Sequence, residues 1–295
     1  MNRIGIVGQG FVGSAVREGM RHAFAVYTHD KEKGQAVWYD KSEAHNPNCP
    51  DGGVVWMAQE VDGPIFICVP TPMNPDGSAS TAIVESVVGE LNEAAKKVGK
   101  RLILVVKSTV PPGTCERLDK EHQEVDVCFN PEFLTERNAV QDFKNQDRII
   151  LGGPRPATNT LKAVYEQAFP QVPVTKTSST IAELVKYMTN CYLASKVAFA
   201  NEFSQICEAL GEDYDKVVEY ATKDKRLGTY WSVPGPDGKK GFGGSCFPKD
   251  LNALIFTAKE IGVDPKVMLA TWEKNLEVRP EKDWESLKGR AVVDE

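Results

Sequence analysis

The chain has 295 residues, with 35 Lys and Arg against 41 Asp and Glu and a formal net charge of −6. That length allows about two domains with cores of their own. The chain is mildly acidic and has no long basic run, which argues against a nucleic-acid partner. It also has no apolar run of roughly 18 residues, which argues against a membrane partner. The seven cysteines show no zinc-ligand spacing and several lie in apolar runs, so we expect a reduced, cytoplasmic protein without a metal.

The N-terminal part of the chain contains a glycine pattern set in the order strand, turn, helix, strand. Residues 3–7 form a strand-like run, and Gly8-x-Gly10-x-x-Gly13 then opens a helical pattern. In a dinucleotide-binding turn the first glycine makes the tight turn, the second admits the pyrophosphate, and the third lets helix and strand pack closely. Asp30 is placed to accept hydrogen bonds from both ribose hydroxyls, which favours NAD over NADP; an exposed turn aspartate is the alternative. The predicted cofactor contacts in this region are Gly8, Gly10, Phe11, Val12, Gly13, Asp30 and Lys33.

The next part of the chain alternates between strand-like and helical patterns. Strand-like runs lie at 64–69, 101–106, 125–129 and 148–152, and helical patterns such as 80–99 separate them. This alternation predicts an α/β fold with a parallel, doubly wound sheet of the Rossmann type.

Polar side chains follow three of these strands. Thr71 and Thr109 come just past strand ends, where open α/β sheets bind ligands, although turn chemistry would also explain them. The segment 130–136 resembles a helix start with proline in its first turn, which would put Glu132 and Glu136 on one helix face. Such a pair indicates a polar site, but early glutamates also favour the helix dipole.

A long helix is predicted from Thr180, where Thr180 and Glu183 resemble a capping box, to a stop at Gly211. Its apolar composition predicts burial on most sides, as a spine between two domains or across a dimer. Lys186 and Asn190 are four residues apart on this mostly buried helix and need partners. A bound oxyanion would satisfy both; an ion pair between the lysine and a neighbouring glutamate is the alternative.

Further helices are predicted near 213–223, 250–262 and 266–278, with a loop at 229–240. The loop leads into the sequence Gly-Phe-Gly-Gly-Ser-Cys-Phe-Pro-Lys-Asp at 241–250.

Cys246 in this sequence is a candidate nucleophile. It lies between a flexible glycine turn that includes Gly243 and the predicted start of a helix, with Lys249 nearby. A helix N-terminus and a cation both favour thiolate over thiol. The alternative is a glycine loop in which Cys246 merely packs.

Together these motifs resemble the UDP-glucose/GDP-mannose dehydrogenase family, in order and spacing and over nearly the whole chain. The motifs that carry the resemblance are the glycine pattern with Asp30, Val-Pro-Thr-Pro at 69–72, Lys-Ser-Thr-Val-Pro-Pro-Gly-Thr at 107–114, Asn-Pro-Glu-Phe-Leu at 130–134, the Lys186 and Asn190 helix, and 241–250. Within the family the UDP-glucose branch is the most similar.

The resemblance implies a four-electron oxidation of the C6 alcohol of a nucleotide sugar, UDP-glucose to UDP-glucuronate, with two NAD⁺ and a thioester on the cysteine. The residues implied in catalysis are Cys246, Lys186, Asn190, Asp250, Glu136 and Thr109. Those implied to contact the substrate are Glu132, Phe133, Leu134, Glu136, Lys186, Asn190, Gly243, Cys246 and Arg226, the last across a homodimer interface. Further cofactor contacts implied are Thr71, Thr109, Glu136 and Lys249.

The expected division is an NAD-binding domain at 1–177, a connecting helix at 178–211 and a helical catalytic and dimerisation domain at 212–295. The loop before Cys246 is longer than the family's, and 287–293 resembles the first strand of a third domain that the family carries. The motifs leave open a GDP-mannose substrate, a two-electron β-hydroxyacid dehydrogenase, and a non-catalytic NAD- or sugar-binding subunit.

Overall fold

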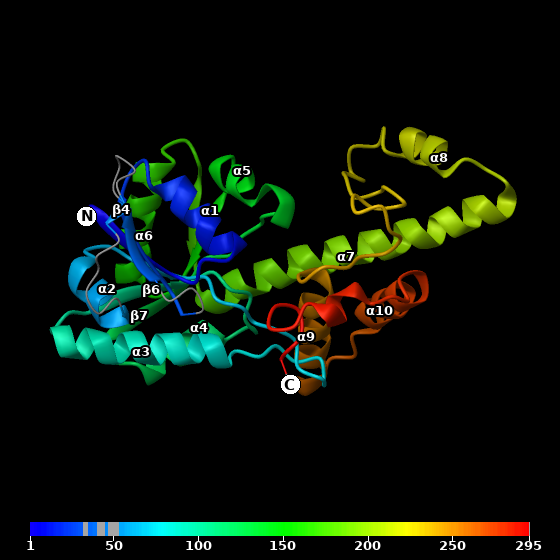
Figure 1. Cartoon of the computed structure of the whole chain (residues 1–295). Helices are drawn as coiled ribbons and strands as arrows, with labels where there is room; N and C mark the ends of the chain where they lie inside the picture. The colour runs from blue at the N-terminus through cyan, green and yellow to red at the C-terminus, as the bar shows by residue number, and fades with distance from the viewer. Residues whose placement is uncertain (32–34, 40–44, 47–52, 295) are drawn as a thin grey trace. The chain divides into compact units, whose positions relative to one another are not determined.

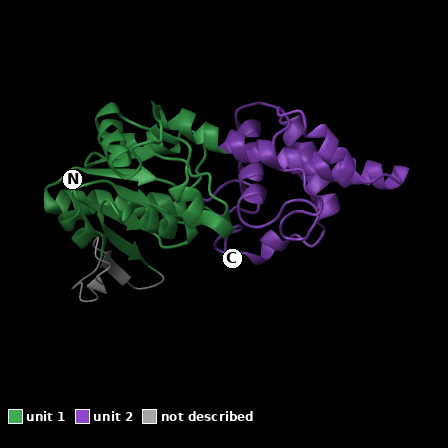
Figure 2. Ribbon diagram, turned by 90° about the horizontal axis from the view of Figure 1, so that it is seen from above, with its two compact units in different colours: residues 1–71, 81–186 green, residues 72–80, 187–295 purple. Residues whose placement is uncertain are grey.

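The computed structural model describes residues 1–31, 35–39, 45–46 and 53–294, with side chains described outside 32–52 (Figure 1). The predicted contact Lys33 lies outside the described residues. The chain divides into two compact units, which are Met1–Thr71 with Thr81–Lys186, and Pro72–Ser80 with Tyr187–Glu295 (Figure 2). The second unit therefore contains a short excursion of the chain that directly follows Thr71.

Unit 1 is built on a nine-stranded sheet, counted over its described residues, in the order β4-β3-β2-β1-β5-β6-β7-β8-β9. The strands are β1 (Arg3–Val7), β2 (Ala25–Asp30), β3 (Gln35–Tyr39), β4 (His45–Asn46), β5 (Ile65–Ile67), β6 (Leu102–Val106), β7 (Val125–Phe129), β8 (Ile149–Gly152) and β9 (Val174–Thr177). The predicted strands are present, and β3, β4 and β9 are additional.

The central strands β2, β1, β5, β6 and β7 are parallel, as predicted, whereas β8 pairs antiparallel with β7 and β3 pairs antiparallel with β2. The chain runs outward from β1 to β2 on one side and returns to β5 on the other. This reversal is the topological switch point at which doubly wound sheets bind ligands.

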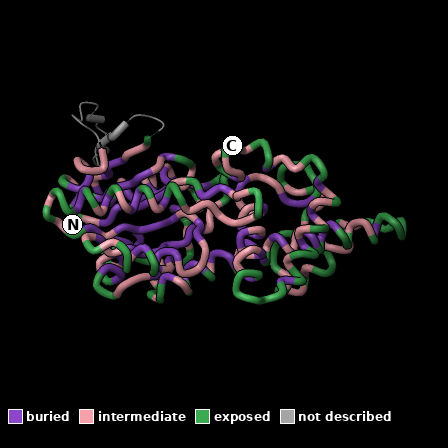
Figure 3. The backbone as a smooth tube through the Cα atoms, turned by 90° about the horizontal axis from the view of Figure 1, so that it is seen from below, coloured by how far each residue is buried: buried purple, intermediate pink, exposed green. Residues whose placement is uncertain are grey.

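Helices cover both faces of the sheet, and alternating side chains on the strands explain why. On β6, Leu102, Leu104 and Val106 belong to one core and Val105 to the other, because successive side chains of a strand point to opposite faces. One core includes α2 (Val54–Glu60), α3 (Ala82–Val98) and α4 (Thr114–Glu121). The other includes α1 (Phe11–Met20), α5 (Ala139–Lys144) and α6 (Arg155–Ala168). The central strands β1, β5, β6 and β7 are accordingly mostly buried (Figure 3).

The long helix α7 (Ser179–Leu210) has close to its predicted length, but its N-terminus is not a capping box. The Ile181 N–H donates to Ser178 Oγ at 3.3 Å, and Glu183 is turned away to accept hydrogen bonds from the Gly113 and Cys115 N–H groups. Glu183 is fully buried and satisfies the N-terminus of α4 instead of its own helix.

Unit 2 is helical, apart from isolated β-bridges, in its described residues. Its helices are the C-terminal part of α7, α8 (Tyr214–Ala221), α9 (Phe247–Glu260), α10 (Lys266–Val278) and the 3₁₀ turn η2 (Asp283–Ser286). Its core joins Tyr187 and Cys191 of α7 to Leu251 and Ile255 of α9, with Trp272 of α10 packed against them.

The segment 287–293 is not a regular strand. It folds into a turn closed by the Gly289 N–H donating to the Val292 carbonyl, and it forms a single bridge to the 72–80 excursion, where the Met73 N–H donates to the Ala291 carbonyl. In the described part of the chain, none of the helices combines the length and apolar character needed to cross a membrane.

Candidate active site

The glycine turn of unit 1 has the tight geometry that its sequence predicts. Gly8 has a φ of 89°, and a Cβ on Gly13 would lie 1.9 Å from the Gly8 carbonyl oxygen, so the crossing of strand and helix requires glycine there. A Cβ on Gly10 would meet nothing within 4 Å, which leaves the backbone open to a close ligand. Phe11 and Val12 begin α1, whose first turn has no side-chain cap and no acidic residue.

Asp30 is drawn into this turn. The Gln9 N–H donates to Asp30 Oδ2 at 2.7 Å, and the Gly8 N–H donates to the His29 carbonyl, so the ends of β1 and β2 are held side by side. An uncapped helix N-terminus attracts phosphate, and a carboxylate at the end of the second strand suits ribose hydroxyls. These residues fit a dinucleotide such as NAD.

Thr71 and Thr109, both buried, follow β5 and β6 on the same edge of the sheet. The Ser108 hydroxyl donates to the Val69 carbonyl at 2.6 Å and ties the two strand ends together. A Cβ on Gly8 would lie 2.6 Å from the Cys68 carbonyl oxygen, so the glycine turn packs directly against this edge. The predicted cofactor residues of unit 1 that the structure describes therefore gather at the switch point, except Glu136.

The helix predicted at 130–136 is absent, and this prediction was wrong. Residues 130–135 are irregular, and Glu136 begins the 3₁₀ turn η1 (Glu136–Asn138) and is exposed. Glu132 is buried and accepts the Leu134 N–H on Oε2 at 2.7 Å, while Asp142 accepts the Thr135 N–H. Side chains thus take the backbone donors that a helix would use, and the two glutamates do not share a helix face.

Lys186 of α7 forms a buried ion pair with Glu132, its Nζ lying 2.9 Å from Oε1 and 2.7 Å from the Glu132 carbonyl oxygen. The structure therefore shows the second of the two arrangements expected for Lys186, an ion pair with a neighbouring glutamate. Burial raises the pKa of Glu132, but Lys186 and the Leu134 N–H outweigh it and leave that pKa below its ordinary value. Phe133 lies beside this pair, 5.8 Å from Lys186 Nζ to its ring centroid, and Leu134 is half-buried.

Lys107 is a buried residue of this region to which the sequence assigned no role. Its Nζ donates to Asn130 Oδ1 at 2.7 Å, and Tyr165 donates to the same oxygen. Burial lowers the pKa of Lys107 to about 8, with Cys68 and Glu132 opposing that shift and Lys186 adding to it. Its sequence signals were its place at the end of a buried strand and its position as the first residue of the 107–114 motif.

In unit 2, Cys246 is the N-cap residue of α9 and is half-buried, as the sequence predicts from the glycines and Pro248. Its Sγ lies 3.8 Å from the Ser245 hydroxyl oxygen. Gly244 before it has a φ of 68°, a left-handed conformation that glycine adopts readily.

Asp250, one turn further along α9, is almost fully buried between two donors. Asn190 of α7 donates its amide N–H to Oδ2 at 2.6 Å, and Lys249 Nζ lies 2.5 Å from Oδ1. Unit 2 thus brings together Cys246, Lys249, Asp250 and Asn190. Arg226 is not with them: its side chain is 89% exposed and pairs with Asp224.

Two family models match the chain. Residues 57–169 match the NAD binding domain and residues 180–277 the central domain of the UDP-glucose/GDP-mannose dehydrogenase family. The Bacillus subtilis protein with the name "Putative UDP-glucose 6-dehydrogenase YtcA" is 33% identical, over 92% of this chain and 67% of its own length. The chain belongs to the UDP-glucose/GDP-mannose dehydrogenase family. Membership makes it an enzyme of the NAD-dependent nucleotide-sugar dehydrogenases, with NAD as cofactor.

Other members of the family agree with this assignment. A UDP-glucose 6-dehydrogenase of Pseudomonas aeruginosa is 36% identical over 72% of this chain, and the match spans 48% of that protein. The UDP-glucose dehydrogenase of the archaeon Pyrobaculum islandicum superposes with a TM-score of 0.81 at 30% identity, over 97% of this chain and 70% of that one. The chain therefore spans between about half and about 70% of the length of these relatives.

The Mycobacterium tuberculosis 3-hydroxyisobutyrate dehydrogenase has a TM-score of 0.72 over 96% of this chain and 95% of that one. At 16% identity this likeness shows the shared fold alone.

Proposed function

We propose that this chain oxidises the C6 alcohol of UDP-glucose to the carboxylate, giving UDP-glucuronate, in a four-electron reaction that consumes two NAD⁺ and one water. The observation that carries the proposal is a half-buried cysteine, Cys246, at the N-terminus of α9 in a member of this family. A two-electron β-hydroxyacid dehydrogenase needs no such thiol. Because the chain is most similar in sequence to the UDP-glucose branch of the family, we favour UDP-glucose over GDP-mannose as its substrate.

Cys246 is the proposed nucleophile. NAD⁺, when bound, accepts the hydride that leaves C6 in each of the two oxidations. After the first oxidation, the Cys246 thiolate forms an S–C bond to the aldehyde carbon and the carbonyl π electrons move to oxygen, giving a thiohemiacetal. Loss of the second hydride leaves a thioester on Cys246. Attack by water then breaks the S–C bond, which releases the carboxylate and restores the thiol.

Lys186 and Asn190 are proposed to stabilise the negative oxygen of these intermediates. A cation and an amide N–H donor four residues apart on one helix face are suited to a developing oxyanion. Asp250, which holds the Asn190 amide at 2.6 Å, is the proposed acceptor of protons, with Glu136 and Thr109 handling water. The side chain of Glu136 is exposed, so its assignment rests on the family resemblance and not on its surroundings.

The remaining assignments follow the family. Glycines of the 8–13 turn, Asp30, Lys33, Thr71 and Lys249 are proposed to contact NAD, and the segment 132–136 with Gly243 the sugar nucleotide. We assign NAD binding to residues 1–177, connection to the helix at 178–211, and catalysis and dimerisation to 212–295. The connecting helix takes part in both of these functions, through Lys186 and Asn190 and through its exposed apolar face.

We also propose a homodimer, to which Arg226 would contribute a substrate contact from the partner subunit. Eight large apolar residues on α7 are more than a third exposed and recur at spacings of three, four or seven, so they form one stripe. They are Ile181, Leu184, Met188, Tyr192, Phe199, Phe203, Ile206 and Leu210. A contiguous exposed apolar stripe marks an interaction surface, and a second copy of the same helix would cover it symmetrically.

Substitution of the nucleophile tests the chemistry. Cys246→Ser should abolish net conversion of UDP-glucose to UDP-glucuronate, followed by chromatography of the nucleotide sugars, while NAD binding stays within about twofold because the thiol contacts the sugar. Unchanged UDP-glucuronate formation by the variant would show that Cys246 is not the nucleophile. A parent protein that forms no carboxylate and one NADH per sugar would favour a two-electron enzyme, and absence of turnover by the parent protein with either UDP-glucose or GDP-mannose would favour a binding subunit.

A further inference from the structure

The glycine loop that precedes Cys246 is held in place by side chains from two helices. The Gly241 N–H donates to Asn201 Oδ1 of α7 at 3.0 Å. Asn275 of α10, fully buried, accepts the Phe242 N–H at 2.7 Å and donates its own amide to the Phe242 carbonyl at 2.9 Å. Specific side-chain partners therefore hold the loop in one of the conformations that its glycines allow.

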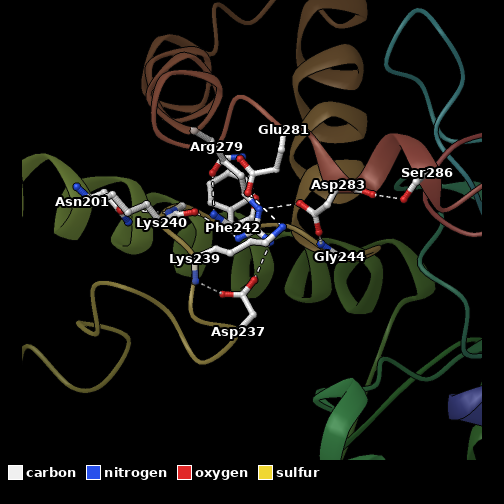
Figure 4. Close-up of polar contacts among 12 residues, drawn as sticks. Asn201, Asp237, Lys239, Lys240, Phe242, Gly244, Arg279, Glu281, Asp283 and Ser286 are labelled. Carbon is white, nitrogen blue, oxygen red and sulfur yellow. Dashed lines mark hydrogen bonds and ion pairs between the residues drawn. The ribbon is translucent and has the colours of Figure 1, made fainter.

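Arg279, one turn after Asn275, joins this loop to two acidic side chains (Figure 4). Its Nε lies 2.6 Å from Asp283 Oδ1, and its Nη2 lies 2.7 Å from Asp237 Oδ2. The second oxygen of Asp283 accepts the Gly244 N–H at 3.2 Å. One guanidinium thus reaches the backbone two residues before Cys246 through Asp283, and the preceding 229–240 loop through Asp237.

The guanidinium is buried, with 2% of the side chain exposed, whereas its two partners are about one third exposed. Burial disfavours the charge of Arg279, but the bonds to Asp283 and Asp237 outweigh it and raise its pKa. Burial likewise opposes the charge of Asp283, and Arg279 and the Gly244 N–H outweigh it and lower that pKa. All three groups therefore stay charged at neutral pH, and a buried cation that loses a partner is strongly destabilising.

The guanidinium and Asp283 also pack directly on the loop. A Cβ on Gly243 would lie 2.4 Å from Arg279 Nη2 and 2.4 Å from Asp283 Oδ1. The absence of a side chain at Gly243 is what lets this ion pair approach the backbone before Cys246 so closely.

We propose that Arg279 is a positioning residue for Cys246, which it holds in the N-cap position of α9 through Asp283 and Gly244, while its separate contact with Asp237 anchors only the 229–240 loop. The inference rests on the proposed role of Cys246 as nucleophile. A thiol gains thiolate character from a helix N-terminus only while it is kept at that N-terminus, so release of the Asp283 contact lowers its reactivity.

Matched truncation of the two acidic partners tests the proposal. Asp283→Ala and Asp237→Ala each remove one ion pair from Arg279 and start from similar exposure. The readout is the rate constant for alkylation of Cys246 by iodoacetamide at pH 7.5, measured on the Cys246 peptide by mass spectrometry without NAD or sugar. Asp283→Ala should slow alkylation about fivefold or more, and Asp237→Ala should leave it within about twofold.

Asp237→Ala should instead speed limited proteolysis within 229–240. Glu281→Gln, which removes the exposed Lys239–Glu281 ion pair beside the same cluster, serves as the control and should change neither readout. If Asp283→Ala does not fold, Asp283→Asn and Asp237→Asn replace the alanine pair, because each removes one negative charge and keeps the side-chain volume. Asp283→Asn should then slow alkylation more than Asp237→Asn does.

Equal alkylation rates in the Asp283 and Asp237 variants, or a faster rate in the Asp283 variant, would overturn the proposal and leave Arg279 a purely structural residue. Because this readout needs no turnover, it decides the role of Arg279 even if the parent protein fails to oxidise UDP-glucose. Loss of turnover by Cys246→Ser, by contrast, concerns the proposed function alone.

Discussion

Single buried charges in this protein are matched by specific partners, and the sequence predicted the charges better than the partners. Lys186 was expected to need a counterpart because its helix was predicted to be buried on most sides, and it has one in Glu132. The predicted burial of α7 was wrong for the isolated chain, since a stripe of its apolar side chains is exposed. The identity of that counterpart depended on a backbone segment, 130–135, whose irregular path came from hydrogen bonds to Glu132 and Asp142. Such long-range side-chain contacts have no local signature, so the pattern of proline and glutamates wrongly predicted a helix.

Lys186→Ala should lower kcat by about 100-fold or more, because a lost oxyanion donor acts in the transition state, and should leave the Kd for NAD within about threefold. Steady-state kinetics with UDP-glucose measure kcat, and a fluorescence titration with NADH measures the Kd of the cofactor. Lys97→Ala, at an exposed lysine of α3, is the control. Comparable losses in kcat and in NAD affinity would contradict the assigned role.

Lys107 should make the stability of unit 1 depend on pH in an unusual direction. Its pKa is about 8 in the fold against an ordinary value of 10.5 for an unfolded chain, so between these values the unfolded chain binds more protons and stability rises with pH. From pH 7.5 to 9.5 this group should add about 2 kcal/mol. Urea unfolding at both pH values should show this gain in the parent protein and lose it in Lys107→Met; the same gain in both proteins would refute it.

At the scale of elements, strands and helices with strong periodicity were predicted well, and their ends were not. The central parallel strands and α10 lie where the sequence placed them. The capping box at Thr180 was wrong because Glu183 satisfies the N-terminus of a different helix, α4. The edge strand β9 was missed because its sequence, Val-Thr-Lys-Thr, has a single apolar residue. The strand β3, Gln-Ala-Val-Trp-Tyr, was missed although its residues are typical of strands.

Glu183→Ala should destabilise the protein by about 2 to 4 kcal/mol, because two N–H groups of the α4 N-terminus, one buried and one partly buried, would lose their acceptor. The free energy of unfolding in urea measures this. Glu116→Ala, at an exposed glutamate of α4 that pairs with Lys120, should leave the free energy of unfolding nearly unchanged, because exposed ion pairs contribute little. Similar losses for the two variants would show that Glu183 does not cap α4.

At the scale of the whole molecule, the fold class and the family could be predicted from the sequence. The glycine turn and the residues that follow each strand are determined by short motifs of neighbouring residues. The partners of the cysteine loop could not be predicted: Arg279 and Asp283 lie more than thirty residues beyond Gly244, and no motif in the sequence connects them to it. Their contact depends on how α9 and α10 pack.

The exposed stripe on α7 predicts a dimer at this scale. Met188→Glu with Tyr192→Glu should convert a dimer into a monomer, because charges would have to be buried in the interface. Light scattering after size-exclusion chromatography measures the mass. Ile261→Glu, at an exposed apolar residue at the end of α9, should leave the mass unchanged. A parent protein that is monomeric at micromolar concentration would contradict the homodimer.

The most direct test of the account is the number of NADH formed per sugar. Purified protein is incubated with excess NAD⁺ and limiting UDP-glucose, and absorbance at about 340 nm is followed to completion. Two hydrides leave C6 when an alcohol becomes a carboxylate through a thioester, so the account predicts two NADH per UDP-glucose. One NADH per sugar would contradict the role of Cys246 in a second oxidation.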